Sequence, residues 1–289
     1  MIQKSLMSRI VLGNSGSALA LQQARIVLSE LADEWPDLNI TQRTIRGASS
    51  PQEVLDALLA GKMSIALLSA DDLPRTLPEE ISIAAVTKRL EPRTAVVSKG
   101  KKRLSDLAED AVVGVSSYRD RTFVLAHYKN LEVQVFEGGF DEHFNRISTG
   151  ELTALVLPAS TLIRLGHRQH IEVLLDVDVL TPRVGQGAMA LLVRSDDDVG
   201  FDTAYTLQHR PSFDRVQAER SFASAFDEAY AVGALATVSP DGELSLFGAV
   251  ASEQNDVLIQ AEISGEAREA QDLGKELAQD VLGQLNATN

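Results

Sequence analysis

Two turns that each join an expected strand to an expected helix hold the side chains best suited to bind an anion. Residues 13–17 read Gly-Asn-Ser-Gly-Ser, and residues 114–117 read Gly-Val-Ser-Ser. Backbone N–H groups at a helix start, together with serine hydroxyls, favour a carboxylate or another anion. Each turn alone favours simple helix capping, because serine and asparagine are preferred there without a ligand. Two such turns in two α/β halves nevertheless favour a ligand site in a cleft. The expected binding residues are Ser15, Ser17, Ser116, Ser117 and the nearby Arg119.

Two adjacent carboxylates form a second candidate site. Asp71 and Asp72 follow the apolar run 65–68, which predicts a buried strand. Paired carboxylates at a strand end could do acid–base chemistry, because one negative charge can keep its neighbour protonated. The spacing alone favours a structural interpretation, in which Asp72 caps a short turn before Leu73-Pro74 and Asp71 is solvated.

A glycine-flanked glutamine completes the set of candidate binding residues. Gln186 stands between Gly185 and Gly187, which predicts a tight backbone bend with a polar group directed at a partner. A bend at the entrance to a strand is the simpler interpretation. The histidines lack metal-ligand spacing and have no companion cysteine, so we expect no metal site.

Composition narrows the classes of protein further. The 289-residue chain has no cysteine, which excludes disulfides, thiolate metal sites and thiol nucleophiles. Its formal charge is −14, and residues 200–289 hold 5 basic and 15 acidic side chains, so the first two thirds are the better place for an anion site. Neither a positive field for nucleic acid nor an apolar run long enough for a bilayer is present. We expect a cytoplasmic protein with no nucleic-acid or membrane partner.

The hydrophobic pattern predicts the elements that position these residues. Short apolar runs alternate with helical spacing over 9–68, which predicts a β-α-β-α-β unit, and a second such set covers 100–195. From residue 200 the pattern changes to a helix, a hairpin turning at 240–242, a further strand and a long helix over 267–285. The sequence therefore predicts an α/β protein with a smaller α+β unit at the end of the chain.

Segments spread over nearly the whole chain resemble, in order, the motifs of the porphobilinogen deaminase (hydroxymethylbilane synthase) family. Several are weak alone, but their order and spacing together are fairly specific. They are residues 17–21 (S-P-L-A-L in the family), 69–74 (H-S-M-K-D-V-P), 91–95 (E-D-P-R-D-A), 114–119 (G-T-S-S-L-R-R), 162–166 (G-L-K-R-L-G), 182–188 (P-A-V-G-Q-G-A) and 218–220 (A-E-R).

The resemblance implies a fold and an activity. The fold would be two periplasmic-binding-protein-like α/β domains around a cleft and a small C-terminal α+β domain. We expect these domains at 1–99 with 175–199, at 100–174 and at 200–289. The activity would be the head-to-tail condensation of four porphobilinogens with release of ammonia, on a dipyrromethane cofactor bound to one cysteine. Asp72 corresponds to the family's catalytic aspartate.

Departures from the family pattern change what the resemblance implies. The family's cysteine segment corresponds to Asp227–Tyr230, which reads Asp-Glu-Ala-Tyr, so no cofactor attachment and no dipyrromethane cofactor are expected. Asp71 stands where the family has lysine, and Asp120 and Glu137 stand where it has arginine. Carboxylates in place of guanidiniums would repel a polycarboxylate chain.

Three functional hypotheses follow from the sequence. The first is a catalytically impaired deaminase-like protein of tetrapyrrole biosynthesis with a repurposed cleft. Its partner would be a small anionic or pyrrole-like ligand or a tetrapyrrole-pathway protein. The second is an active hydroxymethylbilane synthase that uses a non-covalent primer. The third is a solute-binding protein of the periplasmic-binding-protein type.

Overall fold

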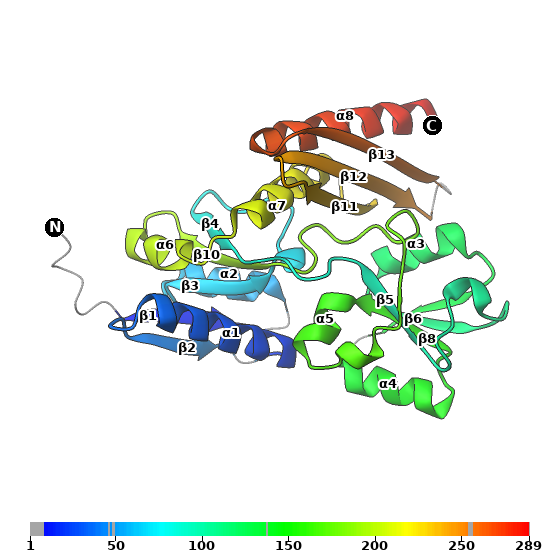
Figure 1. The fold of residues 1–289 in the computed structure, drawn as a ribbon, viewed down its shortest axis with the longest axis horizontal. Helices are drawn as coiled ribbons and strands as arrows, with labels where there is room; N and C mark the ends of the chain where they lie inside the picture. Colours follow the sequence, from blue (N-terminus) through cyan, green and yellow to red (C-terminus); the bar gives the residue numbers. More distant parts are fainter. Residues whose placement is uncertain (1–8, 46, 48–49, 137, 254–256, 289) are drawn as a thin grey trace. The chain divides into compact units, whose positions relative to one another are not determined.

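The computed structural model describes residues 9–45, 47, 50–136, 138–253 and 257–288. The chain divides into two compact units (Figure 1). Unit 1 consists of Met1–Leu90 and Ala188–Phe213, and unit 2 consists of Glu91–Gly187 and Asp214–Asn289. Among the described residues, no helix is long and apolar enough to cross a membrane.

Unit 1 is built on a five-stranded sheet in the order β2-β1-β3-β10-β4. The strands are β1 (Ile10–Asn14), β2 (Ile40–Thr44), β3 (Ile65–Ser69), β4 (Ile81–Val86) and β10 (Met189–Arg194). β2, β1 and β3 are parallel, whereas β10 runs antiparallel to both β3 and β4. Because β10 comes from a distant part of the chain, this sheet is completed only by residues that follow the first part of unit 2.

Helices flank this sheet at the positions that the local sequence favours. They are α1 (Ala18–Glu34), α2 (Pro51–Leu59), α6 (Asp198–Tyr205) and the short 3-10 helix η1 (Ala70–Asp72). Ser17 caps α1, since its side chain accepts a hydrogen bond from the backbone N–H of Ala20. Pro51 occupies the first turn of α2, where its missing N–H costs no hydrogen bond. Apolar side chains of α1, β1, β3 and β10 form one buried core.

The first part of unit 2 is a second five-stranded sheet, in the order β7-β6-β8-β5-β9. Its strands are β5 (Thr94–Ser98), β6 (Val112–Val115), β7 (Glu132–Val135), β8 (Ala154–Pro158) and β9 (Val173–Leu174). Its helices are α3 (Tyr118–His127), α4 (Phe140–Thr149) and α5 (Ala159–Arg164), with the 3-10 turns η2 (Leu104–Asp106) and η3 (Arg168–His170). β6 pairs in parallel with β7 and β8, so the turn that precedes α3 lies at the carboxyl end of a parallel strand.

The rest of unit 2 is the expected α+β region. β11 (Ala231–Val238), β12 (Glu243–Ser252) and β13 (Val257–Glu266) form an antiparallel sheet. The long helix α8 (Ala270–Thr288), preceded by η4 (Ala267–Glu269), packs on this sheet, as Figure 1 shows. Most of α7 (Arg210–Ala223) belongs to this unit, and Phe222 of α7 is fully buried in the same core.

The mixed α/β class with a small C-terminal sheet and helix is confirmed. The two units differ from the expected domains at three places. Residues 91–99, with β5, and residues 175–187 were expected in the first domain and belong to unit 2. Residues 200–213 were expected in the third domain and belong to unit 1. β5 pairs antiparallel with β8 over its whole length and with β9 at two positions, all within unit 2. The buried Ala95, Val96 and Val97 hold it in that core. Local hydrophobicity identifies such a strand without indicating which sheet it joins.

Candidate carboxylate-binding site

A polar cluster in unit 2 begins at the turn between β6 and α3. Ser117 caps α3, because its hydroxyl accepts a hydrogen bond from the backbone N–H of Asp120 at 3.1 Å. Ser116 directly precedes it and donates its hydroxyl to Asp120 Oδ2 at 3.0 Å. Both serines therefore lie at the helix start, as the sequence predicts, and both contact Asp120.

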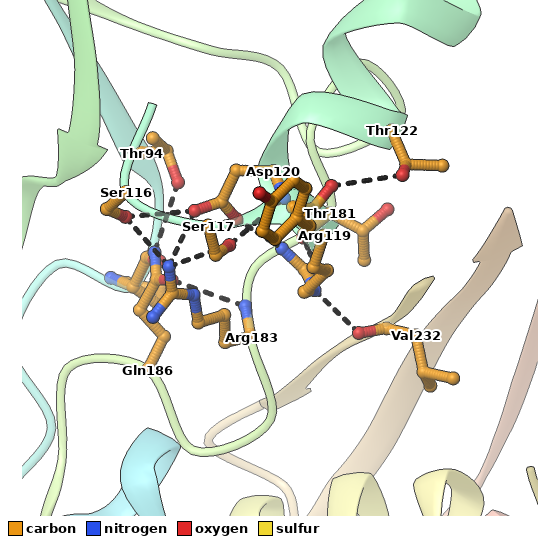
Figure 2. Close-up of polar contacts among 12 residues, drawn as sticks. Thr94, Ser116, Ser117, Arg119, Asp120, Thr122, Thr181, Arg183, Gln186 and Val232 are labelled. Atoms are coloured by element: carbon orange, nitrogen blue, oxygen red, sulfur yellow. Dashed lines mark hydrogen bonds and ion pairs between the residues drawn. The ribbon is translucent and has the colours of Figure 1, made fainter. Parts of the chain in front are cut away.

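Asp120 is the centre of this cluster. Its side chain lies between two guanidiniums: Arg119 Nη1 is 2.8 Å from Oδ1 and Arg183 Nη2 is 2.6 Å from Oδ2 (Figure 2). The residue is only 5% exposed. Burial by itself raises the pKa of the Asp120 carboxyl. The charges of Arg183 and Arg119, with hydrogen bonds from Arg183 and Ser117, outweigh burial and hold that pKa well below its usual range. Asp120 is therefore ionised at neutral pH.

Arg119 is directed into the protein. Its Nε donates to the backbone carbonyl of Val232 at 2.7 Å, and its Nη2 donates to the carbonyl of Thr181. Its guanidinium carbon lies 4.7 Å from the centroid of the Phe123 ring. All three nitrogens of this guanidinium thus have partners inside unit 2, so Arg119 joins α3 to β11 and to the segment at 181.

Arg183 closes the cluster from the opposite side. Its Nη2 donates to Ser116 Oγ at 2.7 Å, to Ser117 Oγ at 3.0 Å and to Asp120 Oδ2 at 2.6 Å. With two guanidiniums and one carboxylate, the cluster carries a formal charge of one positive unit. The carboxylate that these guanidiniums hold in the structure is the chain's own Asp120.

Gln186 is placed inside the protein and shapes the loop that carries Arg183. It is 1% exposed, and its Nε2 donates to the carbonyl of Pro92 at 2.6 Å and to Thr94 Oγ1 at 3.2 Å. Its Oε1 accepts from the backbone N–H of Arg183 at 3.3 Å. The sequence predicts that this amide is directed at a partner. In the structure that partner is the chain itself.

The remaining candidates of unit 1 gather at one edge of the first sheet. Because β1 and β3 are adjacent and parallel, the turn at 15–17 and the η1 helix with Asp71 and Asp72 both follow carboxyl strand ends. The turn is braced by Asn14, whose Oδ1 accepts the backbone N–H of Gly16 at 2.9 Å. Asp72 is exposed, while Asp71 and Ser15 are half-buried. Unit 1 thus brings Ser15, Ser17 and the two aspartates to one edge.

Comparison with known proteins identifies the family. A family model described as "Porphobilinogen deaminase, dipyromethane cofactor binding domain" matches residues 10–200. The chain belongs to the porphobilinogen deaminase family. It is 41% identical to the porphobilinogen deaminase of Thermus thermophilus, over 95% of this chain and 96% of the relative. It is 35% identical to that of Deinococcus radiodurans, over 96% of each chain. The recognition made from the sequence motifs is confirmed, and with it the link to tetrapyrrole biosynthesis.

Solved structures give much weaker likenesses. YhfZ from Shigella flexneri is 17% identical with a TM-score of 0.43, over 74% of this chain and 96% of that one. A nutrient-binding protein from Burkholderia cenocepacia bound to methionine is 17% identical with a TM-score of 0.45, over 68% and 91%.

Arg183 was not among the binding residues expected from the sequence, although the motif at 182–188 contains it. The deaminase family has alanine at this position and arginine at the position of Asp120. This chain therefore gains a base at 183 and an acid at 120, and the two side chains form an ion pair. Two opposite changes of charge, one at the turn between β6 and α3 and one in the loop before β10, were the available signal. When each position is compared with the family by itself, the missing arginine at 120 is noticed but its new partner at 183 is not.

The expectation that this chain has no cofactor was wrong. The matched model is the dipyrromethane cofactor-binding domain of the deaminase family, which points to that cofactor. The residues present do not fit a cysteine-bound dipyrromethane, because the chain has no cysteine and Arg119 is directed at Asp120 and two backbone carbonyls. Contacts other than a thioether would have to hold the group.

The segment Asp227–Tyr230, from which the absence of a cofactor was argued, forms a turn before β11. Asp227 Oδ1 accepts the N–H of Ala229 at 2.9 Å, and the backbone N–H of Tyr230 donates to the carbonyl of Asp227 at 3.4 Å. The first three residues are exposed, whereas Tyr230 is half-buried and packs against the core beneath α8. The residues of this turn therefore show only that no thiol stands there. The family match points to the dipyrromethane cofactor. It corrects the expectation, drawn from Asp227–Tyr230, that the cofactor is absent.

Two further expectations concern single positions. Glu137, expected where the family has arginine, lies outside the described residues. Among the residues that are described, no group of three or more His, Cys, Asp or Glu side chains could hold a metal ion.

Proposed function

We propose that this member of the porphobilinogen deaminase family has impaired hydroxymethylbilane synthase activity and binds a small anionic or pyrrole-like ligand. The observation that carries the proposal is the Asp120 carboxylate, which is buried between Arg119 and Arg183. It occupies the position at which a carboxylate of a ligand would pair with these guanidiniums. A cytoplasmic location and a tetrapyrrole-pathway protein as a partner belong to the same proposal.

The electrostatic reason is the charge of the product chain. Each pyrrole that is added brings two carboxylates, so negative charge accumulates beside a cluster that already contains the Asp120 carboxylate. A like-charge contact with the fixed Asp120 carboxylate costs several kcal/mol in a desolvated site. A single small ligand avoids most of this cost, because only one of its carboxylates needs to meet the cluster.

Asp72 is the proposed acid–base residue of unit 1. It corresponds to the family's catalytic aspartate, stands at the end of the short η1 helix that follows β3, and is exposed. Ser15 and Ser17 would orient the polar groups of a ligand bound at that same edge of unit 1. Asp71, which replaces the family's lysine, adds negative charge beside Asp72 and so disfavours a second carboxylate there.

A charge exchange tests the proposal. In the double variant Asp120→Arg, Arg183→Ala both positions return to the family's residues. We expect it to bind porphobilinogen at least about tenfold more tightly than the wild type, because one like-charge contact is removed. Isothermal titration calorimetry measures this. Asp141→Asn is the matched control, since it makes the same net change of one charge unit at a side chain that is 89% exposed.

Turnover distinguishes impairment from full activity. Wild-type consumption of porphobilinogen is expected about 100-fold below that of the Thermus thermophilus relative, since about 3 kcal/mol of lost stabilisation corresponds to two factors of ten. Equal rates for the two proteins would refute the impairment.

An active synthase with a primer that is not bound to cysteine is the second candidate. It is favoured by the match to the cofactor-binding domain and by the presence of Asp72, Ser116 and Ser117. Intact-mass spectrometry of the purified protein beside the turnover assay separates the two. Turnover by a protein whose mass equals that of the bare chain, abolished in Asp72→Ala, supports this candidate. The solute-binding alternative gains no support from the solved structures.

A further inference from the structure

The segment 181–187 lies along β11 and is fastened to it from two sides. One backbone hydrogen bond joins them directly, from the N–H of Ala234 to the carbonyl of Pro182 at 3.0 Å. Two charged side chains from different helices supply further bonds between the same two pieces of chain. Arg183, which contacts Ser116, Ser117 and Asp120, stands in the middle of this segment.

Arg119 fastens the first end by donating to carbonyls. Its Nε reaches Val232 of β11, and its Nη2 reaches Thr181. Gly233 lies between these contacts, and a Cβ added there would come within 2.8 Å of Thr181 Cβ and 2.9 Å of the Thr181 carbonyl oxygen. The close approach of the two segments therefore requires glycine in β11.

Glu219 fastens the second end by accepting from amides. It lies on α7 and has no exposed surface. Its Oε2 accepts the N–H of Gly185 at 2.7 Å, and its Oε1 accepts the N–H of Ala236 at 2.8 Å. A carboxylate is well suited to this position, because it accepts at both oxygens and donates at neither. The two side chains are thus complementary: the cation binds two carbonyls and the anion binds two amides.

We propose that Glu219 is a positioning residue that holds the Arg183 guanidinium in the carboxylate cluster by fixing the backbone at Gly185. Arg183 is two residues from each fastened end, at Thr181 and at Gly185, so its backbone has little freedom. Gln186 adds a bond to the N–H of Arg183 itself. The inference rests on the proposed function only in treating Arg183 as part of the binding site.

A purely structural role is the alternative, in which Glu219 only satisfies two buried amides. Loss of the carboxylate would then lower stability without changing the environment of Arg183. The test must therefore report on Arg183 itself. The hydrogen-bonded guanidinium protons of arginine exchange slowly with water and give separate NMR signals, which Arg183→Lys assigns by their disappearance.

Glu219→Gln replaces one acceptor oxygen by an NH₂ group that faces a backbone N–H. We expect the guanidinium protons of Arg183 to exchange at least about tenfold faster in this variant, because the loop opens locally more often. The 13C resonance of the Asp120 carboxyl should also titrate at higher pH, since Arg183 contributes to the low pKa of that group. Unchanged Arg183 exchange in a folded variant would overturn the proposal.

Two further variants keep the test decisive. Asp197→Ala removes a carboxylate of unit 1 that accepts the N–H of Gly200 at 2.9 Å, and it should leave the Arg183 signals unchanged. Glu219→Asp retains two acceptor oxygens on a side chain shorter by one methylene, and it serves if the glutamine variant does not fold. In Glu219→Asp we expect the guanidinium protons of Arg183 to be partly protected from exchange with water. Full protection of these protons counts against the proposal. These readouts need no ligand, so failure of the proposed activity would not affect them.

Discussion

The sequence and the folded chain indicate different roles for Asp120. Compared with the family motif, it is a lost arginine that would repel a carboxylate. In the fold it is the counter-ion of Arg119 and Arg183, and it is almost inaccessible to solvent. A buried ion pair is costly to break, because the partner left behind is a desolvated charge. The same residue therefore stabilises unit 2 and limits what the cluster can bind.

Replacing Asp120 by asparagine should destabilise the protein by about 3 kcal/mol near neutral pH, since two partly buried guanidiniums lose their counter-ion. The sign of the pH dependence follows from the lowered pKa of Asp120 in the folded state. The stabilisation is fully present above the unfolded value of about 4 and is lost as the pH falls through the folded value. Urea unfolding at several pH values should show the gap between wild type and variant narrowing toward acid.

Asp141→Asn is the control for that series. Asp141 pairs with His167 but is 89% exposed, so its loss should change stability little. A gap between wild type and Asp120→Asn that stays constant down to acid pH would mean that Asp120 is not the titrating group.

The serines and Arg119 could be identified from the sequence, but the hydrogen-bond network that they form could not. The helix-start preference of serine is local, so the positions of Ser17 and Ser117 could be predicted. Arg183, the second arginine partner of Asp120, lies 63 residues further along the chain, and no local pattern connects the two residues. Gln186 illustrates the opposite error, because a polar residue between glycines indicates a contact without indicating whether a ligand or the chain supplies it.

At the scale of elements, the contact between β11 and the segment 181–187 depends on a position without a side chain. Gly233→Ala places a methyl group against Thr181 and Arg119. We expect the free energy of unfolding to fall by about 2 kcal/mol, because neither backbone can move freely. Thermal unfolding measures it. Gly283→Ala in α8 is the matched control: its added methyl meets nothing within 4 Å, so a small gain of up to about 1 kcal/mol is expected. Equal effects of the two changes would contradict the close approach.

Elements with a strong local period could be predicted, and elements defined by their partners could not. The helix after Ser17 follows from its capping residue, and the hairpin between β11 and β12 follows from the turn at 240–242. The two-residue strand β9 exists only because it pairs with β5, and its sequence is too short to show a period. The antiparallel place of β10 between β3 and β4 is likewise set by the sheet.

At the scale of the whole molecule, charge is distributed unevenly. The chain carries a formal charge of −14, with most of the acidic excess in residues 200–289. Self-repulsion of this kind is screened by salt, whereas a buried ion pair is screened much less. The melting temperature should therefore rise when NaCl is increased from about 10 mM to about 300 mM.

The Asp120→Asn variant provides the internal comparison for this prediction. Its melting temperature should rise with salt by the same amount as that of the wild type, so the difference between the two proteins stays constant. Differential scanning calorimetry at the two salt concentrations measures both. A difference that shrinks in high salt would show that water and ions reach the Asp120 cluster.

The place of β10 in the first sheet also sets an order of events during biosynthesis. β3 and β4 are made early, but the strand that separates them emerges from the ribosome only after another hundred residues have been added. During that interval both strands present unpaired backbone edges in a nascent chain, and such edges can pair with the wrong partner. Translation speed across residues 91–187 thus sets how long these strand edges stay unpaired.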